Sequence, residues 1–405
     1  MREGWSSTAL KNVCTVDKAK HSGTTLPYVG LEHIEGGTGK FIGSLAPATV
    51  KSTTFSFTAS HVLYGRLRPY LNKVLLPEFD GHCSSEIFPL RVESSLDRRF
   101  LYYWLTWEPV VKEIDSTSTG ARMPRANINK LLEFELPLPS LPEQKRIVAI
   151  LDEAFAGIAT AVANTEKNLA NARELFESYL DSVFSNLPSG KNRQSLSALC
   201  GQGGITYGVI KLGNEWPSGV PCLRTSNVRR LHIDTRGMKR IDPALSNQYS
   251  RTILEGGEVL ANVRGTLGGV AVATSDMAGW NVSREVAVIP VDTNKVLPEF
   301  AAYGIATRPS QDWLFGVQKG VAYRGINLTD LRELKIPVPS IDVQTRYVTQ
   351  LNEMASNCAA IELRCRHKLS SLDELKQSLL QKAFSGELTA GKEDSDVTRN
   401  KEKVA

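Results

Sequence analysis

The chain has 405 residues, of which 41% are hydrophobic and 22% charged, enough for roughly two to four domains with sizeable cores. Its 48 Lys and Arg residues against 43 Asp and Glu give a net charge of +5, which permits nucleic-acid binding but does not require it. The N-terminus has no apolar signal core, and we find no run apolar enough to span a membrane, so we expect a cytoplasmic protein. The six cysteines form no Cys-x-x-Cys pair, and we expect Cys358 and Cys365, seven positions apart, to be reduced core residues of a helix.

The chain begins with a globular α/β region that extends to about residue 130. We expect strands within residues 26–34 and 84–92, and a strand pair within 58–76 that turns at Arg68-Pro69. Residues 97–107 carry aromatic and aliphatic side chains at helical spacing and predict a short helix. A polar loop, residues 116–125, closes the region.

A strand, a helix-capping residue and a long helix follow this region. The alternating prolines of Phe134-Glu135-Leu136-Pro137-Leu138-Pro139 favour extended backbone, because a residue before proline is pushed out of the helical region. Ser140 is a good helix cap, and Glu143 three positions later completes a capping box. About 45 residues of helix at 1.5 Å each predict a rod of roughly 68 Å.

The same strand–helix stretch occurs a second time with every position shifted by 200, from Leu131 and Leu331 to Ser185 and Ser385. A fixed-offset repeat of this length indicates a duplicated architecture. The apolar positions form a heptad seam, with one extra spacing of four at Thr165 to Leu169 and at Cys365 to Leu369. Since such a helix cannot bury its seam alone, we predict that the two helices pair antiparallel, the alternative being two helices packed in separate domains.

Between the two helices lies a second globular region that parallels the first more loosely. Leu260-Ala261-Asn262-Val263-Arg264 resembles Leu63-Tyr64-Gly65-Arg66, and Ser283-Arg284-Glu285-Val286 resembles Ser84-Ser85-Glu86-Ile87. A linker rich in Pro and Gly separates this region from the first helix, and a polar tail that we expect to be disordered follows Leu388. The two globular regions, called heads, have diverged, while the two long helices that form the frame have stayed alike. This suggests that the heads recognise two different targets.

The order of variable region, PLPS helix, variable region and PVPS helix, ending in Ala383-Phe384-Ser385-Gly386-Glu387-Leu388, resembles the specificity subunit of Type I restriction-modification enzymes. The resemblance covers nearly the whole chain. It implies an α/β (α+β) fold with two target-recognition domains joined by two long helices in an antiparallel coiled coil with pseudo-twofold duplication. The corresponding ranges are 1–139 for the first domain, 140–186 for the central spacer helix, 187–339 for the second domain, 340–388 for the C-terminal spacer helix and 389–405 for the tail.

The resemblance also implies a role. Each domain would bind one half of a bipartite double-stranded DNA site, and the helices would dock two methyltransferase subunits, with restriction/translocase subunits joining that core. S-adenosylmethionine would then belong to the methyltransferase partner, and we expect no cofactor, metal or catalytic residue in this chain. Accordingly, Gly36-Gly37-Thr38-Gly39-Lys40-Phe41 has the wrong spacing for a phosphate-binding loop, and Gly265-Thr266-Leu267-Gly268-Gly269 does not open a convincing helix. The six histidines show no metal-ligand spacing.

The candidate DNA-binding residues are basic side chains that lie among turn residues, because arginine binds both guanine edges and phosphates. In the first head they are Arg66, Arg68, Lys73, Arg122 and Arg125, and in the second Arg224, Arg229, Arg230, Arg264, Lys319 and Arg324. Tyr70, Tyr207 and Tyr323 are possible additional contacts. Two alternatives stay open: the specificity subunit of a modification-only adenine methyltransferase complex, and a coiled-coil scaffold that does not bind DNA.

Overall fold

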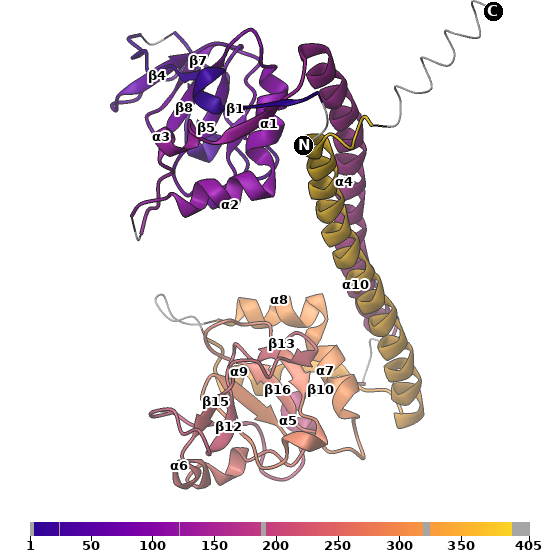
Figure 1. Cartoon of the computed structure of the whole chain (residues 1–405). Helices are drawn as coiled ribbons and strands as arrows, with labels where there is room; N and C mark the ends of the chain where they lie inside the picture. The colour runs from indigo at the N-terminus through magenta and orange to yellow at the C-terminus, as the bar shows by residue number, and fades with distance from the viewer. Residues whose placement is uncertain (1–3, 24, 121, 188–191, 319–324, 391–405) are drawn as a thin grey trace, which may run out of the picture. The chain divides into compact units, whose positions relative to one another are not determined.

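The computed structural model describes residues 4–23, 25–120, 122–187, 192–318 and 325–390 (Figure 1). The chain divides into two compact units, unit 1 with Met1–Thr165 and His367–Ala405, and unit 2 with Glu166–Arg366. Each unit therefore combines one head with a segment of each long helix, α4 (Leu141–Ser185) and α10 (Ile341–Ser385). The predicted tail from residue 391 onward and the centre of the linker, 188–191, lie outside the described residues.

Head 1 is built on two sheets. The four-stranded sheet has the order β2 (Cys14–Val16), β8 (Ile87–Val92), β5 (Val62–Gly65), β6 (Val74–Leu75), and the three-stranded sheet has the order β3 (Tyr28–Val29), β7 (Gly81–Ser84), β4 (Thr54–Phe57). The other elements are β1 (Ser6–Ala9) paired with β9 (Glu135–Leu138), the helices α1 (Arg98–Thr106), α2 (Glu108–Ser116) and α3 (Ile128–Leu131), and the short 3-10 turns η1 (Leu10–Asn12), η2 (Leu31–His33) and η3 (Pro69–Leu71). The strand pair that turns at Arg68-Pro69 and the helix after Asp97 are confirmed.

One predicted strand of head 1 is much shorter than expected. Within residues 26–34 only β3 is extended, and the turn η2 follows directly. The reason is local, because the imidazole Nδ1 of His33 accepts a hydrogen bond from the Gly30 amide at 3.1 Å and closes the turn.

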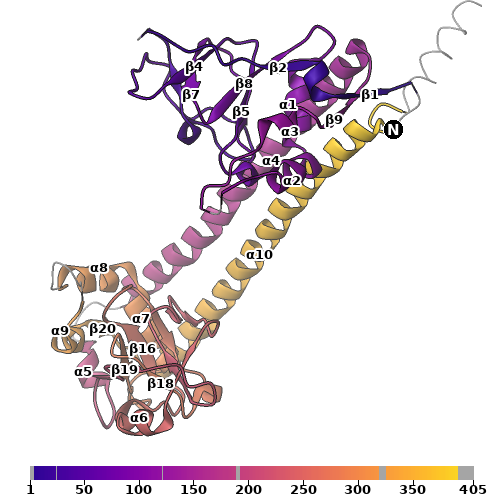
Figure 2. The same ribbon diagram turned by 60° about the vertical axis from the view of Figure 1, so that its left-hand side comes forward.

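Head 2 repeats this plan. Its four-stranded sheet has the order β11 (Thr206–Tyr207), β19 (Val286–Ile289), β16 (Val259–Asn262), β17 (Val270–Val272), and its three-stranded sheet the order β15 (Lys239–Ile241), β12 (Val220–Leu223), β18 (Asn281–Val282). Two strand pairs, β10 (Arg193–Ser195) with β20 (Lys335–Pro337) and β13 (Val228–Arg229) with β14 (His232–Ile233), complete the sheets. The helices are α5 (Leu196–Leu199), α6 (Pro243–Asn247), α7 (Pro298–Ala306), α8 (Arg308–Gly316) and α9 (Leu328–Glu333), with turns η4 (Ser250–Thr252) and η5 (Ser275–Met277). Helix α7 packs beside β16, β17 and β20. Figure 2 shows α7 next to β16 and β20.

The two long helices pair antiparallel within each unit. In unit 1 the core contains Ile147 and Leu151 from the start of α4 together with Leu380 and Phe384 from the end of α10. In unit 2 the roles are exchanged, since the end of α4 and the start of α10 share the core. Arg173 of α4 also forms an ion pair with Glu362 of α10 at 3.2 Å.

The predicted seam is buried or half-buried along both helices with one exception. Ile361, which the heptad spacing predicts on the seam between Cys358 and Cys365, is 40% exposed, and Glu362 lies inward instead, where it meets Arg173. The seam thus shifts by one residue close to the extra four-residue spacing, where the heptad register breaks. Cys358 and Cys365 are buried seam residues with free thiols, as predicted.

By length and composition alone, one helix of the described chain, Leu141–Ser185, is apolar enough to cross a membrane. The expectation that no such run exists is therefore wrong on this criterion. Apolar side chains at both ends of the helix enter protein cores, Leu151 in unit 1 and Leu180 in unit 2.

Two buried glutamines, one in each unit, fix each head to the long helix that follows it. The Gln144 side chain accepts a hydrogen bond from the Asp97 amide at 2.7 Å and donates to the carbonyls of Ser95 and Pro139 at 3.0 and 2.9 Å. Gln344 makes the same three bonds with Leu297, Lys295 and Pro339, each 200 positions later. Both glutamines are fully buried, so the duplicated architecture extends to individual polar contacts.

Candidate nucleic-acid interface

In head 1 the predicted arginines lie on two adjoining turns. Arg66 and Arg68 follow β5, and the segment that ends at Ala126 runs beside them: the Arg68 amide donates to the Pro124 carbonyl at 2.7 Å and the Ala126 amide to the Arg66 carbonyl at 2.8 Å. Arg125 bridges back to Thr119, and Arg122 lies between these two residues in the sequence. The fold thus brings together two pairs of arginines, Arg66 with Arg68 and Arg122 with Arg125, that are more than 50 positions apart in sequence.

A single carboxylate holds two of these arginines. Glu86 accepts hydrogen bonds from Nε of Arg66 at 2.9 Å and from Nε and Nη2 of Arg125 at 3.0 and 2.9 Å. The Arg66 guanidinium also lies over the Phe88 ring at 5.3 Å. Burial opposes ionisation of Glu86, but the hydrogen bonds from Arg125 and Arg66 outweigh it and lower the pKa of the carboxyl. The trio carries one net positive charge and forms a fixed support for the two turns.

The remaining arginines of this cluster project from it. Arg68 and Arg122 are exposed, and neither side chain has a hydrogen bond or ion pair with a residue in the described part of the chain. Arg68 has a left-handed backbone with φ of 53°, which is uncommon for a residue with a Cβ and marks a position worth testing for function. Tyr70, 53% exposed, and Met123 lie beside them on the same turns. Lys73 is different, because its Nζ donates to the Leu31 carbonyl at 2.7 Å inside the head.

In head 2 a buried asparagine joins the arginine-bearing turns. The Asn262 amide donates to the carbonyls of Val228 and Thr266, both at 3.0 Å, and so links the turn that contains Arg224 to the turn that contains Arg264. Gly269 is needed beside it, because a Cβ there would lie 2.3 Å from the Asn262 nitrogen. The glycine-rich segment 265–269 is accordingly the connection between β16 and β17 and opens no helix, as expected.

The candidate residues of head 2 again separate into held and exposed side chains. Arg224 donates to the Gly237 carbonyl at 3.0 Å, and Arg230 forms a 2.6 Å ion pair with Glu177 of α4. Arg229 and Arg264 are exposed. Lys319, Tyr323 and Arg324 lie outside the described residues. Tyr207 is 41% exposed on the edge strand β11.

Three polar residues with evident structural roles were not among the sequence candidates: Glu86, Asn262 and Glu177. A signal existed for Glu86, because its segment is one of the loose parallels between the heads. The carbonyls of Glu86 and Glu285 also occupy the same place, since they accept from the Arg66 amide and from the Val263 amide. Asn262 also lies in one of these parallel segments, whereas nothing in the local sequence distinguishes Glu177 from an ordinary polar residue.

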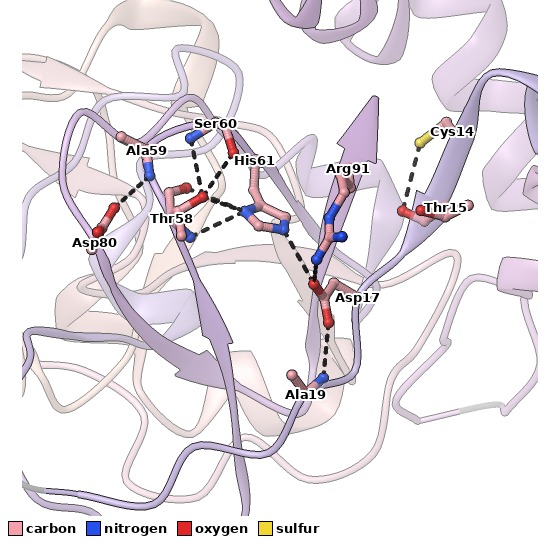
Figure 3. A network of polar contacts seen from close by, with 10 residues as sticks. All are labelled: Cys14, Thr15, Asp17, Ala19, Thr58, Ala59, Ser60, His61, Asp80 and Arg91. Atoms are coloured by element: carbon pink, nitrogen blue, oxygen red, sulfur yellow. Dashed lines mark hydrogen bonds and ion pairs between the residues drawn. The ribbon is translucent and has the colours of Figure 1, made fainter. Parts of the chain in front are cut away.

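The polar network in Figure 3 contains a threonine, a histidine and an aspartate in line, the groups of a hydrolase triad. The Nδ1 atom of buried His61 lies 3.0 Å from the Thr58 hydroxyl, and Nε2 lies 3.6 Å from the Asp17 carboxylate, which also pairs with Arg91. However, Nδ1 also accepts from the Thr58 amide at 3.0 Å, so its lone pair is occupied and is not free to take the hydroxyl proton. The network braces the turn between β4 and β5.

The glycine-rich segment 36–40 is a structural turn and presents carbonyl groups, not a phosphate-binding nest. The Gly37 carbonyl accepts from Nζ of Lys376 at 2.8 Å, and the Thr38 carbonyl accepts from the Tyr102 hydroxyl at 3.1 Å. Gly37 and Gly39 have positive φ angles of 75° and 65°. Across the described part of the chain, no group of three or more His, Cys, Asp or Glu residues is placed to hold a metal ion.

Comparisons with known proteins agree with this arrangement. The family model of the Type I restriction modification DNA specificity domain matches residues 2–169 and 211–369. The EcoBI specificity subunit of Escherichia coli is 24% identical over 321 residues, which cover 74% of this chain and 67% of that protein. The EcoDI specificity subunit of Escherichia coli is 29% identical over 185 residues, 44% of this chain and 41% of that protein.

Two solved structures share the fold. A chain from a study of complex assembly and conformational transition of the type I R-M system has a TM-score of 0.79 at 21% identity, and the match covers 96% of this chain and 99% of that one. The HsdS subunit of Thermoanaerobacter tengcongensis has a TM-score of 0.57 at 22% identity, covering 96% and 98%. At these identities the likeness describes the fold.

Proposed function

Because the chain belongs to the Type I restriction modification DNA specificity family, we propose that it is the sequence-recognition subunit of a Type I restriction-modification complex. In this role it binds a bipartite double-stranded DNA site, one half-site for each head. It supplies recognition, and the chemistry on DNA is done by partner subunits.

The observation that carries this proposal is the matched presentation of arginines by two heads with the same framework. The four-stranded sheets have equivalent strand orders, and the arginines follow the equivalent strands β5 and β16. The loops around them differ, with a carboxylate clamp in head 1 and an amide link in head 2. A constant framework with different loops is what two different half-sites require, because base edges are distinguished by individual side chains.

We further propose that the long helices set the spacing of the half-sites and dock two methyltransferase subunits, with restriction/translocase subunits joining that core. The duplication supports this, since two like surfaces suit two copies of one partner. S-adenosylmethionine then binds the methyltransferase partner, in the cytoplasm where the host DNA lies. In a modification-only complex the same chain would lack the restriction partner. Purification of the complex from its host shows which of the two complexes forms.

The test uses the exposed arginines of each head. The complex is purified through a tag on this chain, and bound sequences are selected from a random duplex library. Arg68→Ala/Arg122→Ala should weaken or relax one half-site, and Arg229→Ala/Arg264→Ala the other, each by about 1–3 kcal/mol of discrimination for every lost base contact. If both double variants alter the same half-site, or if neither changes binding, the assignment of heads to half-sites is wrong.

A further inference from the structure

The arginine cluster of head 1 contains an acidic side chain at the surface proposed to meet a polyanion. Left unpaired, a carboxylate there would repel phosphates, and replacing it would only strengthen DNA binding. The Glu86 side chain is 23% exposed and both of its oxygens accept from guanidinium groups, so it is paired from two sides. Three side chains from different segments must converge to form this arrangement, so it is not expected to arise by chance.

The clamp joins three parts of the chain. Arg66 directly follows β5, Glu86 lies between β7 and β8, and Arg125 bridges to Thr119. Arg125 uses its Nε–Nη2 edge for Glu86, and its Nη1 points toward the Met123 carbonyl at 3.4 Å. Arg66 is additionally placed against Phe88. The guanidinium group of Arg125 is therefore committed within the head through Nε, Nη1 and Nη2. Arg66 uses its Nε for Glu86, so its Nε–Nη2 edge is not available for a guanine.

We propose that Glu86 is a positioning residue for half-site recognition, that Arg66 and Arg125 serve as its clamp, and that direct contact with the first half-site is made by Arg68 and Arg122. This inference rests on the proposed function. The clamp fixes residues 122–125 against the β5 turn, so that the two exposed arginines keep a constant separation. A constant separation favours one arrangement of base edges over others, whereas a loose loop adapts to many.

The decisive variant is Glu86→Gln, which keeps the shape of the side chain and removes its charge. Freed from the clamp, Arg66 and Arg125 become available to phosphates. Affinity for random-sequence duplex should therefore rise about threefold or more, and the slope of log K against log salt should steepen by about one. At the same time, discrimination at the first half-site should fall about tenfold, which is the scale of one lost bidentate contact.

Arg125→Lys is a second, independent variant. It keeps the positive charge but cannot form the two-pronged bond with Glu86. Discrimination at the first half-site should again fall, while the salt slope stays unchanged. Glu285→Gln, at the equivalent backbone position of head 2, is the matched control and should leave the first half-site as it is in the wild type.

The measurement is selection from a random duplex library with the complex purified from its host, followed by salt titrations on a selected and a scrambled duplex. Opposite changes in non-specific affinity and in discrimination support the clamp. Unchanged discrimination at the first half-site in Glu86→Gln and Arg125→Lys would overturn the inference while leaving the proposed function intact. A wild-type complex that selects no sequence would instead overturn the proposed function.

If Glu86→Gln lowers the thermal stability of head 1 so far that selection is impossible, Arg125→Lys alone decides. Unchanged discrimination at the first half-site in that variant, with affinity for all sequences changed equally, would show that Arg125 is an ordinary phosphate contact and contradict the proposal.

Discussion

Units 1 and 2 use the same internal contacts to attach a head to the helices but different contacts to hold the arginine-bearing turns. In both units a buried glutamine links helix and head, and an aromatic pair closes the core, Phe100 with Phe384 in unit 1 and Phe300 with Phe184 in unit 2. In unit 1 the arginines are held by Glu86 of the same head, whereas in unit 2 Arg230 reaches Glu177 on α4. The contacts that attach each head to the long helices are thus the same in both units, whereas the contacts that hold the arginine-bearing turns differ.

The aromatic pairs give the largest expected effect. Phe384→Ala should destabilise unit 1, and Phe184→Ala unit 2, each by about 3–5 kcal/mol, because each phenylalanine is buried in one core. Urea unfolding followed by hydrogen exchange assigns the loss to a unit. Leu375→Ala and Leu175→Ala, at exposed positions of the same helices, are matched controls expected to cost about 0.5 kcal/mol or less. Equal loss in both units from one phenylalanine variant would contradict the comparison.

The second largest effect on stability is expected from replacing the two buried glutamines. Gln144→Ala and Gln344→Ala each remove a side chain that satisfies one buried amide and two carbonyls, so each should cost about 2–3 kcal/mol. The comparison predicts equal losses within error, one in each unit, measured by the midpoint of urea unfolding. A large difference between the two variants would show that only one of the two bonding networks stabilises its unit.

A smaller effect is expected at the contact present in unit 2 alone. Arg230→Ala removes the ion pair with Glu177, and because both side chains are about one-third exposed, we expect a cost of about 0.5–1 kcal/mol. Faster hydrogen exchange in β13 and β14 would locate the change. Glu177→Ala should behave alike, and the double variant should add little beyond either single change.

The smallest expected effect is on the loss of stability at acidic pH. The folded-state pKa of Glu86 is lowered, so its contribution to stability is present above its unfolded pKa, about 4.3, and is lost as the pH falls through the lower folded value. Thermal melts of the wild type should therefore show part of their loss below about pH 4 from this group, and Glu86→Gln should flatten that slope. An identical acid dependence in the variant would argue against the paired carboxylate.

Much of the frame follows from sequence. A repeat with a constant offset of 200, a proline-rich strand and a heptad seam predict two long helices, because periodicity and capping are local signals. The two helices, the short helix after Asp97 and the turn at Arg68-Pro69 were all predictable in this way. The shift of the seam at Ile361 was not, since it depends on how Glu362 meets Arg173 across the helix pair.

The candidate site was less predictable for a physical reason. Sequence places an arginine on a turn but does not show whether a carboxylate 20 or 39 positions away lies within hydrogen-bond distance of it, as Glu86 does for Arg66 and Arg125. Lys73 had the right residue type, yet its ammonium group is bound to a backbone carbonyl of its own head. DNA contact stays a prediction for every candidate residue in both heads, and exposure makes Arg68, Arg122, Arg229 and Arg264 the first to test.

The division of the chain into units has a consequence for biosynthesis. Unit 2 is one continuous segment inserted into unit 1, whose last core residues, Leu380 and Phe384, lie near the end of the chain. Head 1 is synthesised before unit 2 but cannot complete its core until Leu380 and Phe384 have also been made, whereas unit 2 can close before that. A truncated product that ends before Leu380 would therefore contain a complete unit 2 beside an open unit 1, whose exposed apolar surface marks it for proteolysis.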